Sequence, residues 1–315
     1  MKGNASLFAA VDLGSNAFRM TIGQQVLCNR RPVIQKVKSL REPVRLAEGL
    51  RDDALDALAL ERGWQALERF GKHLSGFKEG RVRAVATSAV RQARNAAVFL
   101  EGAEARLGFP IDVISGQEEA HLVYSGIAHT MPCEKTTRLV VDIGGGSTEL
   151  IVGRGKQPVF AESLAIGSGT FGKRYFADGR VDSRSLQMAE QHACVQFSRV
   201  ARDIGEHAWH AAIGSSGTAR MLARVLKANA LNDGGRDGIT YAGLLRLSLS
   251  LLEAGQVKRL KLVGLQEHRH GMLPGGLAIM LAAFKAFGID DMTPSEPGLR
   301  FGLLHSLLDN RAARH

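Results

Sequence analysis

The sequence contains one short pattern twice, AVDLGSN at residues 10–16 and VVDIGGGS at residues 140–147. Segments 12–23 and 142–153 align without a gap. Each copy runs from an apolar strand through an aspartate and a Gly/Ser turn into a second apolar run, the pattern of a β-hairpin. The repeat therefore predicts two related lobes that face one ligand.

The two turns consist of residue types suited to binding phosphate. Glycine lets the backbone come close to a ligand, and consecutive N–H groups in such a turn form an anion-binding concavity. Either copy alone is better explained by an ordinary hairpin turn, because short Gly-rich matches are weak signals. The pairing of two copies favours a phosphate ligand.

The composition indicates a globular protein that binds a polyanion. With 315 residues, of which 45% are hydrophobic, the chain is long enough for two domains. A net charge of +10 favours nucleic acid, a highly charged nucleotide or inorganic polyphosphate as a partner. Aromatic residues make up only 6% and do not alternate with basic residues, which argues against nucleic acid.

The sequence lacks the patterns expected of membrane proteins, secreted proteins, zinc proteins and disulfide-rich proteins. We see no apolar run near the ~20 residues that a membrane helix needs, and no secretory signal at the start. We therefore expect a cytoplasmic protein without membrane contact. The three cysteines lack Cys-x-x-Cys spacing, which argues against a zinc site or a disulfide framework.

Periodicity and turn signals divide the chain into two lobes, 1–130 and 131–297, with a last helix at about 298–315 that packs back on the first lobe. In the first lobe we expect a single helix over 89–107, capped by Ser88. We also expect a helix after Ser115, where the spacing of Ser115 and Glu118 is that of a capping box.

A third turn of small residues, GSSGTAR at 214–220, follows a short strand and opens a helix. A helix N-terminus with small residues is suited to anions. Ser215, Gly217 and Thr218 are therefore candidates for a further phosphate or nucleotide contact.

Five segments taken together resemble the exopolyphosphatase/guanosine pentaphosphate phosphatase (Ppx/GppA) family in order and spacing. They are DLGSN at 12–16, TSAVR at 87–91, ISGQEEA at 114–120, DIGGGSTE at 142–149 and GSSGT at 214–218. The resemblance covers nearly the whole chain and implies an α/β fold of the actin-like type, with two ribonuclease-H-like lobes and an interlobe cleft. Longer relatives have extra C-terminal helical domains, so this chain resembles the short two-domain form.

The resemblance also implies the roles of individual residues. Glu119 matches the family's catalytic glutamate and would act as the base that activates water. From the sequence alone, Glu118 and Glu119 are equally explained by the favourable interaction of acids with a helix N-terminus. Arg91 would bind phosphate oxygens with its planar guanidinium, or is a surface charge. The backbone amides expected to bind successive phosphates belong to Gly14, Ser15, Asn16, Gly144, Gly145, Gly146 and Ser147.

Three carboxylates are candidates for a metal site. Asp142 and Glu149, with Asp12 from the other lobe, offer the hard oxygen ligands that Mg²⁺ or another divalent cation prefers. Alternatively, Asp12 and Asp142 only accept hydrogen bonds within their own turns.

The function that the resemblance implies is that of a hydrolase of phosphoanhydride bonds, a Mg²⁺-dependent exopolyphosphatase that releases orthophosphate from polyphosphate. One alternative is a phosphohydrolase that converts guanosine pentaphosphate (pppGpp) into the tetraphosphate (ppGpp). Another is a non-catalytic sensor that binds ppGpp or polyphosphate. The sequence leaves the oligomeric state open, a homodimer included.

Two further features of the sequence bear on the site. A group of basic residues would either extend the binding surface for a long polyanion or form a solvated face. The group consists of Lys36, Lys38, Arg41 and Arg45. The segment EHRHGMLPG at 267–275 departs from the family's usual pattern before its Pro-Gly. For His268 and His270, a solvated or hinge role is favoured over metal ligation.

Overall fold

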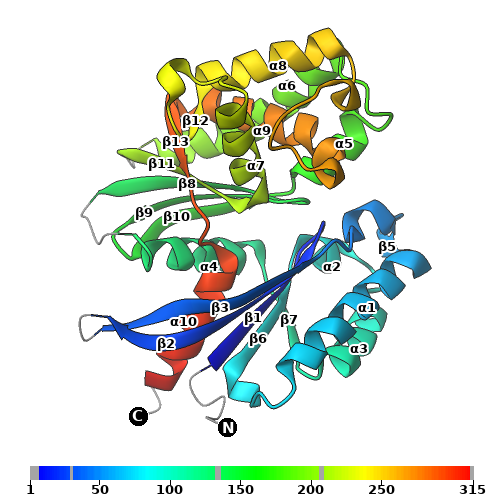
Figure 1. Ribbon diagram of the computed structural model, residues 1–315, viewed down its shortest axis with the longest axis vertical. Coiled ribbons are helices and arrows are strands. Elements are labelled where there is room, and N and C mark those ends of the chain that lie inside the picture. The colour runs from blue at the N-terminus through cyan, green and yellow to red at the C-terminus, as the bar shows by residue number, and fades with distance from the viewer. Residues whose placement is uncertain (1–6, 29–30, 132–135, 206–208, 313–315) are drawn as a thin grey trace. The chain divides into compact units, whose positions relative to one another are not determined.

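The computed structural model describes residues 7–28, 31–131, 136–205 and 209–312 (Figure 1). The chain forms two compact units. The first consists of Met1–Thr130 together with Pro297–His315, and the second of Met131–Glu296.

The first unit is built on a five-stranded sheet of order β3-β2-β1-β6-β7. The first three strands are antiparallel neighbours, and β6 and β7 run parallel to β1. The strands are β1 Leu7–Leu13, β2 Phe18–Cys28, β3 Arg31–Glu42, β6 Val82–Ala86 and β7 Ile111–Val113. Parallel strands bring their carboxyl ends to one edge of a sheet, where ligands commonly bind.

Alternate residues of β1 enter two different cores, because successive side chains of a strand point to opposite faces. Ala9, Val11 and Leu13 pack in the larger core with helices α1 (Ala57–Leu74) and α3 (Ala96–Leu107). Phe8 and Ala10 pack in the smaller one, against α4 (Gly116–Ala128) and α10 (Leu299–Ala312). Burial of both faces stabilises the sheet.

Helix α10 crosses α4 at glycines. A Cβ added to Gly302 would collide with the backbone carbonyl of Leu122, and one added to Gly126 with that of Gly298. The small residues let the two backbones approach closely, and Leu303 and Leu304 fill the core beneath them. The remaining elements of the unit are short: η2 Leu46–Gly49, β4 Leu50–Arg51, β5 Ala54–Leu55, η3 Glu79–Arg81 and α2 Ser88–Gln92.

The second unit repeats this topology. Its sheet has the order β10-β9-β8-β11-β13-β12, in which β8, β9 and β10 are antiparallel neighbours and β11 and β13 run parallel to β8. The strands are β8 Thr137–Ile143, β9 Thr148–Arg154, β10 Gln157–Leu164, β11 Ala211–Ser215, β12 Ile239–Thr240 and β13 Asp291–Pro294. The repeated sheet confirms the duplicated α/β fold expected from the sequence.

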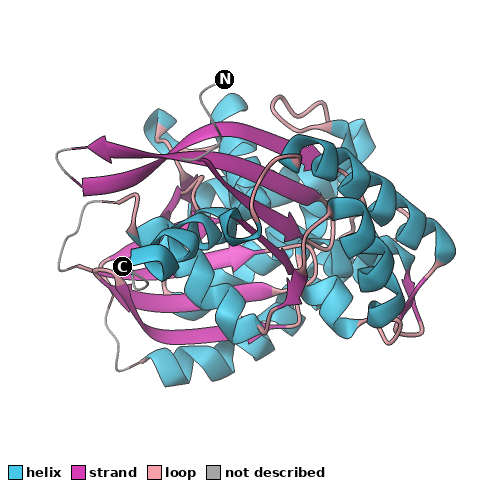
Figure 2. Ribbon diagram, turned by 90° about the horizontal axis from the view of Figure 1, so that it is seen from below, coloured by secondary structure: helices cyan, strands magenta, loops and turns pink. Residues whose placement is uncertain are grey.

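Helices and short 3-10 turns complete the second unit. They are α5 Ser168–Tyr175, α6 Ser183–Ile204, α7 Ser216–Ala228, η4 Asp233–Gly235, α8 Tyr241–Ala254, η5 Val257–Arg259, η6 Glu267–Met272 and α9 Leu273–Phe287. Figure 2 distinguishes the helices, strands and loops of the chain by colour. One continuous hydrophobic core joins these helices to the strands, and α9 is buried along most of its length.

Residues Glu267–Phe287 are long and apolar enough to cross a membrane by length and composition. The sequence interpretation found no such stretch. In the fold, 67% of its most apolar window is buried inside the protein. A helix that is apolar all round is typical of a protein core as well as of a membrane span, and here it packs in the core.

Two expectations for the first unit were wrong in detail. The helix expected over 89–107 is interrupted between α2 and α3, because Asn95 exchanges two hydrogen bonds of 2.9 Å with the backbone of Leu55. The N-cap position of α2 is occupied by Thr87, and Ser88 instead accepts a hydrogen bond from Gln92 at 3.1 Å.

Candidate active site

The first candidate phosphate loop, residues 14–17, joins β1 to β2. The segment before α1 holds it from one side: the amide of Arg45 donates to the carbonyl of Asn16 at 2.8 Å, and that of Ala47 to Ser15 at 2.9 Å. Among the described residues, no partner accepts a hydrogen bond from the amides of Gly14, Ser15 or Asn16. The loop therefore has a fixed shape and three amides available for an anion.

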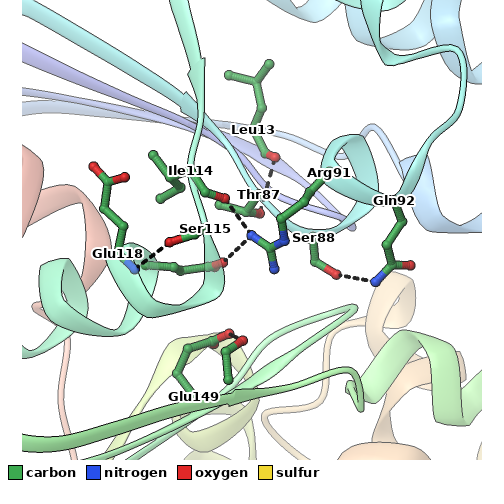
Figure 3. A network of polar contacts seen from close by, with 11 residues as sticks. Leu13, Thr87, Ser88, Arg91, Gln92, Ile114, Ser115, Glu118 and Glu149 are labelled. Atoms are coloured by element: carbon green, nitrogen blue, oxygen red, sulfur yellow. Dashed lines mark hydrogen bonds and ion pairs between the residues drawn. The ribbon is translucent and has the colours of Figure 1, made fainter.

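The turn after β6 lies beside this loop at the same edge of the sheet. The amide of Thr87 donates to the carbonyl of Leu13 at 3.4 Å, which joins the ends of β6 and β1. One turn further along α2, Arg91 Nη1 donates to the carbonyl of Ile114 at 2.8 Å (Figure 3). Arg91 is therefore fixed against the end of β7 and is not a freely solvated charge.

The third segment at this edge is the start of α4. Ser115 Oγ caps the helix by accepting from the amide of Glu118 at 3.1 Å. The reciprocal contact of a capping box is absent among the described residues. Glu118 instead forms an ion pair with Arg83 at 2.7 Å. The expectation of a capping box is thus half correct.

Glu119 and Glu118 have different surroundings although they are neighbours in sequence. Glu119 is buried, with 8% of its surface exposed, and its Oε2 lies 3.4 Å from Arg91 Nη1. Glu118 has a side chain that is 44% exposed. Of the two glutamates, only Glu119 combines burial with proximity to Arg91, which makes it the better candidate for a catalytic carboxylate.

Asp12, at the end of β1, lies among arginines. Arg19 is its direct neighbour on β2, and Arg300 Nη1 of α10 lies 3.7 Å from its Oδ2. Burial raises the pKa of Asp12, although the charges of Arg300 and Arg19 act in the opposite direction. A carboxylate whose charge is shared between two guanidinium groups is a weaker cation ligand than one without them.

In the second unit, the loop 144–147 joins β8 to β9. The expectation that all four amides face an anion is wrong at Gly144, because its N–H donates to the carbonyl of Ser147 at 2.9 Å and closes the turn. The amides of Gly145, Gly146 and Ser147 have no acceptor among the described residues.

The N-terminus of α5 packs directly behind this loop. The amides of Gly169 and Thr170 donate to the carbonyl of Gly145, and that of Ser168 to Gly144. A Cβ added to Gly167 would lie 2.5 Å from the carbonyl of Gly145, so only glycine fits there. The loop is therefore held rigidly from its rear side.

Asp142 and Glu149 are directly opposite each other on β8 and β9, so their side chains lie on the same face. Glu149 is 2% exposed and accepts a hydrogen bond from Ser163 Oγ at 2.9 Å. Mg²⁺ is usually bound by one or two carboxylates together with substrate phosphates. This pair fits such a site. Among the described residues, no group of three or more His, Cys, Asp or Glu side chains is arranged to hold a metal without substrate.

The third loop connects β11 to α7. Ser216 has a φ of 93°, a left-handed value that is strained for a residue with a Cβ. Thr218 Oγ1 donates to Ser168 Oγ at 3.3 Å, and Ser168 in turn bonds Gly144, which couples this loop to the loop 144–147. Ser215 is the direct neighbour of Asp142 on the parallel strand.

Arg269 is a residue at this site that the sequence interpretation missed. It is buried, and its Nη1 donates to the carbonyl of Gly217 at 2.8 Å. The segment 267–272, where the chain departs from the usual family pattern, thus supports the third loop. A lone arginine between two histidines gave no periodic signal from which this contact could be inferred.

Comparison with protein families gives a match over nearly the whole chain. The model of the Ppx/GppA phosphatase family matches residues 25–311. The chain belongs to the Ppx/GppA phosphatase family. It is therefore a hydrolase that acts on phosphoanhydride bonds, as the sequence motifs implied.

Solved structures with a similar fold match nearly all of this chain. A Ppx/GppA family member from Aquifex aeolicus is 25% identical, with a TM-score of 0.76 over 98% of this chain and 99% of that one. An exopolyphosphatase from Cytophaga hutchinsonii is 24% identical, with a TM-score of 0.82 over 96% and 98%. An exopolyphosphatase-like protein is 24% identical, with a TM-score of 0.84 over 98% and 99%.

Proposed function

We propose that this protein is a Mg²⁺-dependent exopolyphosphatase, which releases orthophosphate from the end of inorganic polyphosphate. The observation that carries the proposal is the position of Glu119. Its buried carboxylate lies at the start of α4, 3.4 Å from Arg91, at the sheet edge that also bears the amides of loop 14–17. A base and anion-binding groups at one edge are what hydrolysis of a phosphoanhydride requires.

In the proposed reaction, Glu119 accepts a proton from water as the water oxygen attacks the terminal phosphorus. The bond from that phosphorus to the bridging oxygen breaks, and the electron pair leaves with the shortened chain. Arg91 and the loop amides stabilise the charge that spreads over the phosphate oxygens. The products are orthophosphate and a chain that is shorter by one phosphate.

Asp142 and Glu149 of the second unit would hold Mg²⁺. Bound there, the cation would neutralise phosphate charge. We rest this assignment on these two residues because Asp12 already lies among arginines.

Polyphosphate is the substrate that we favour because of the charge of the chain. A net charge of +10 produces a field that attracts a long polyanion. The names of two similar structures, an exopolyphosphatase and an exopolyphosphatase-like protein, agree with this choice.

The test is release of orthophosphate from polyphosphate and from guanosine pentaphosphate, each with and without Mg²⁺. We expect Mg²⁺-dependent release, faster from polyphosphate. Faster release from guanosine pentaphosphate would establish the nucleotide as the substrate. Tight binding without release from either substrate would establish a sensor.

A further inference from the structure

The two hairpins of the duplicated fold differ in charge along three equivalent cross-strand positions, and at the middle position an arginine replaces a glutamate. In the second unit, Asp142 of β8 is opposite Glu149 of β9, and Glu149 is opposite Ser163 of β10. In the first unit, Asp12 of β1 is opposite Arg19 of β2, and Arg19 is opposite Arg41 of β3. The carboxylate pair suited to a metal in the second unit is thus replaced in the first unit by a cross-strand row of one aspartate and two arginines, Asp12, Arg19 and Arg41.

Arg41 is the residue of this row that the fold leaves unsatisfied. Its Nε and Nη2 are buried, and neither has a hydrogen-bond partner in the described part of the chain. Burial lowers the pKa of Arg41, and the nearby charges of Arg19 and Arg45 lower it further. Buried guanidinium nitrogens without an acceptor are costly, because their protons have lost hydrogen bonds to water and gained none in return.

Neighbouring carboxylates do not compensate Arg41. Glu42, the next residue of β3, pairs with Arg69 at 2.8 Å. Asp12 lies beside Arg19 and Arg300, and Glu48 lies 3.7 Å from Arg45. The two arginines of the row therefore carry an excess of positive charge that a bound anion would neutralise.

The row ends beside the first phosphate loop. The amide of Arg45 donates to Asn16 of that loop, and Asp12 lies two residues before Gly14. A polyanion whose end is bound by the loop amides has its next phosphates within reach of neighbouring side chains. Guanidinium groups make their strongest hydrogen bonds with such phosphate oxygens.

We infer that Arg41, with Arg19 and Arg45, forms a subsite for a non-terminal phosphate of the substrate. The inference rests on the proposed function for the identity of the substrate, a linear polyphosphate. It extends that function because it assigns a second phosphate-binding position to Arg19 of β2, Arg41 of β3 and Arg45 before α1, which lie outside the five segments that resemble the family.

The experiment compares Arg41→Gln with Arg69→Gln as the matched control, since Arg69 is a paired arginine that contacts the adjacent residue of β3. Equilibrium binding of polyphosphate, orthophosphate and guanosine pentaphosphate is measured for the wild type and both variants. We expect Arg41→Gln to weaken polyphosphate binding about tenfold or more, with a much smaller effect on orthophosphate. Arg69→Gln binds as the wild type does.

Thermal unfolding gives an independent readout. Without ligand, Arg41→Gln should unfold at a higher temperature than the wild type, because an unsatisfied buried charge has been removed. A lower unfolding temperature with unchanged polyphosphate affinity would show that Arg41 has a structural role only. If Arg41→Gln fails to fold, Arg41→Lys, which keeps the charge but loses the planar fork, should show an intermediate affinity; wild-type affinity in Arg41→Lys would overturn the subsite.

The remaining outcomes are equally decisive. Equal weakening of orthophosphate and polyphosphate would place Arg41 at the terminal phosphate, and weakening of guanosine pentaphosphate alone would assign the subsite to a nucleotide. Both would overturn the inference. Binding is measured without Mg²⁺, so that the substrate is not hydrolysed. A wild type that binds polyphosphate through Arg41 but releases no phosphate when Mg²⁺ is added would refute the proposed function and leave the subsite intact.

Discussion

Arg91 contacts the end of β7 and Glu119 through the same nitrogen, Nη1, at 2.8 Å from the carbonyl of Ile114 and 3.4 Å from Glu119 Oε2. The arginine thereby fixes the position of the buried carboxylate relative to the sheet. Neither contact involves Glu118, whose carboxylate pairs with Arg83. The two adjacent glutamates should therefore behave differently when they are replaced.

Replacement of Glu119 by Gln should reduce kcat for phosphate release by about 10²–10⁴-fold, because the amide cannot accept the proton of water. Glu118→Gln, the matched control, should retain most of the activity. Polyphosphate affinity of Glu119→Gln should stay close to that of the wild type. Equal loss of activity in the two variants would contradict the assignment of the base.

Removal of Mg²⁺ by a chelator should abolish phosphate release, and addition of Mg²⁺ should restore it. Asp142→Asn should raise the half-saturating Mg²⁺ concentration at least about tenfold, because one carboxylate ligand is lost. Asp12→Asn should leave that concentration unchanged, since Asp12 lies between arginines. A Mg²⁺ titration of the three proteins checks both statements; a larger shift for Asp12→Asn would reverse the assignment.

Gly302→Ala should destabilise the first unit by about 1–3 kcal/mol, since the new methyl group would collide with the carbonyl of Leu122 where α10 crosses α4. Gly80→Ala is the control, because a Cβ at that position meets no atom within 4 Å. Urea unfolding of the two variants gives the comparison. Similar stability of both would mean that the helices separate without cost.

His192 should make the stability of the second unit depend on pH. Burial lowers the pKa of His192 below its ordinary value of 6.5, and the charge of Arg174 lowers it further. The unfolded state therefore binds more protons than the folded state as the pH falls below 6.5, so the free energy of unfolding decreases with decreasing pH.

Thermal unfolding between about pH 5 and pH 8 tests this dependence, because that range brackets the ordinary pKa of histidine. His192→Gln should flatten the pH dependence of the unfolding temperature, and His210→Gln, a change at an exposed histidine of the same unit, should not. A slope that is unchanged in His192→Gln would show that other groups cause it.

The sequence predicted the fold well where the signal is local and repeated. Both hairpins, the loops that follow β1 and β8, and the start of α4 follow from turn residues and alternation within a few positions of each other. The break between α2 and α3 could not be predicted in this way, because Asn95 ends the helix by bonding to Leu55, 40 residues away. Strand β13 was also missed, since its four residues include a proline and depend on pairing with β11.

For the site, the sequence supplied the candidate residues but not their surroundings. Both glutamates at the start of α4 looked alike, and only the partners of each side chain separate them. Likewise, Arg41 was compatible with a solvated face until β3 placed it beside Arg19 with its Nε and Nη2 buried. Cross-strand neighbours and burial depend on the tertiary structure, so they cannot be predicted from the spacing of residues along the sequence.

The crossing of α4 and α10 has a consequence for biosynthesis. Residues 131–296 separate the two helices, so the ribosome makes the whole second unit before α10 is available. Until then, the face of the first sheet formed by Phe8 and Ala10 lacks its cover of Leu303 and Leu304. The helix that bears Glu119 therefore acquires its final support only after the second unit has been synthesised, and the unit whose translation begins first is the last to be completed.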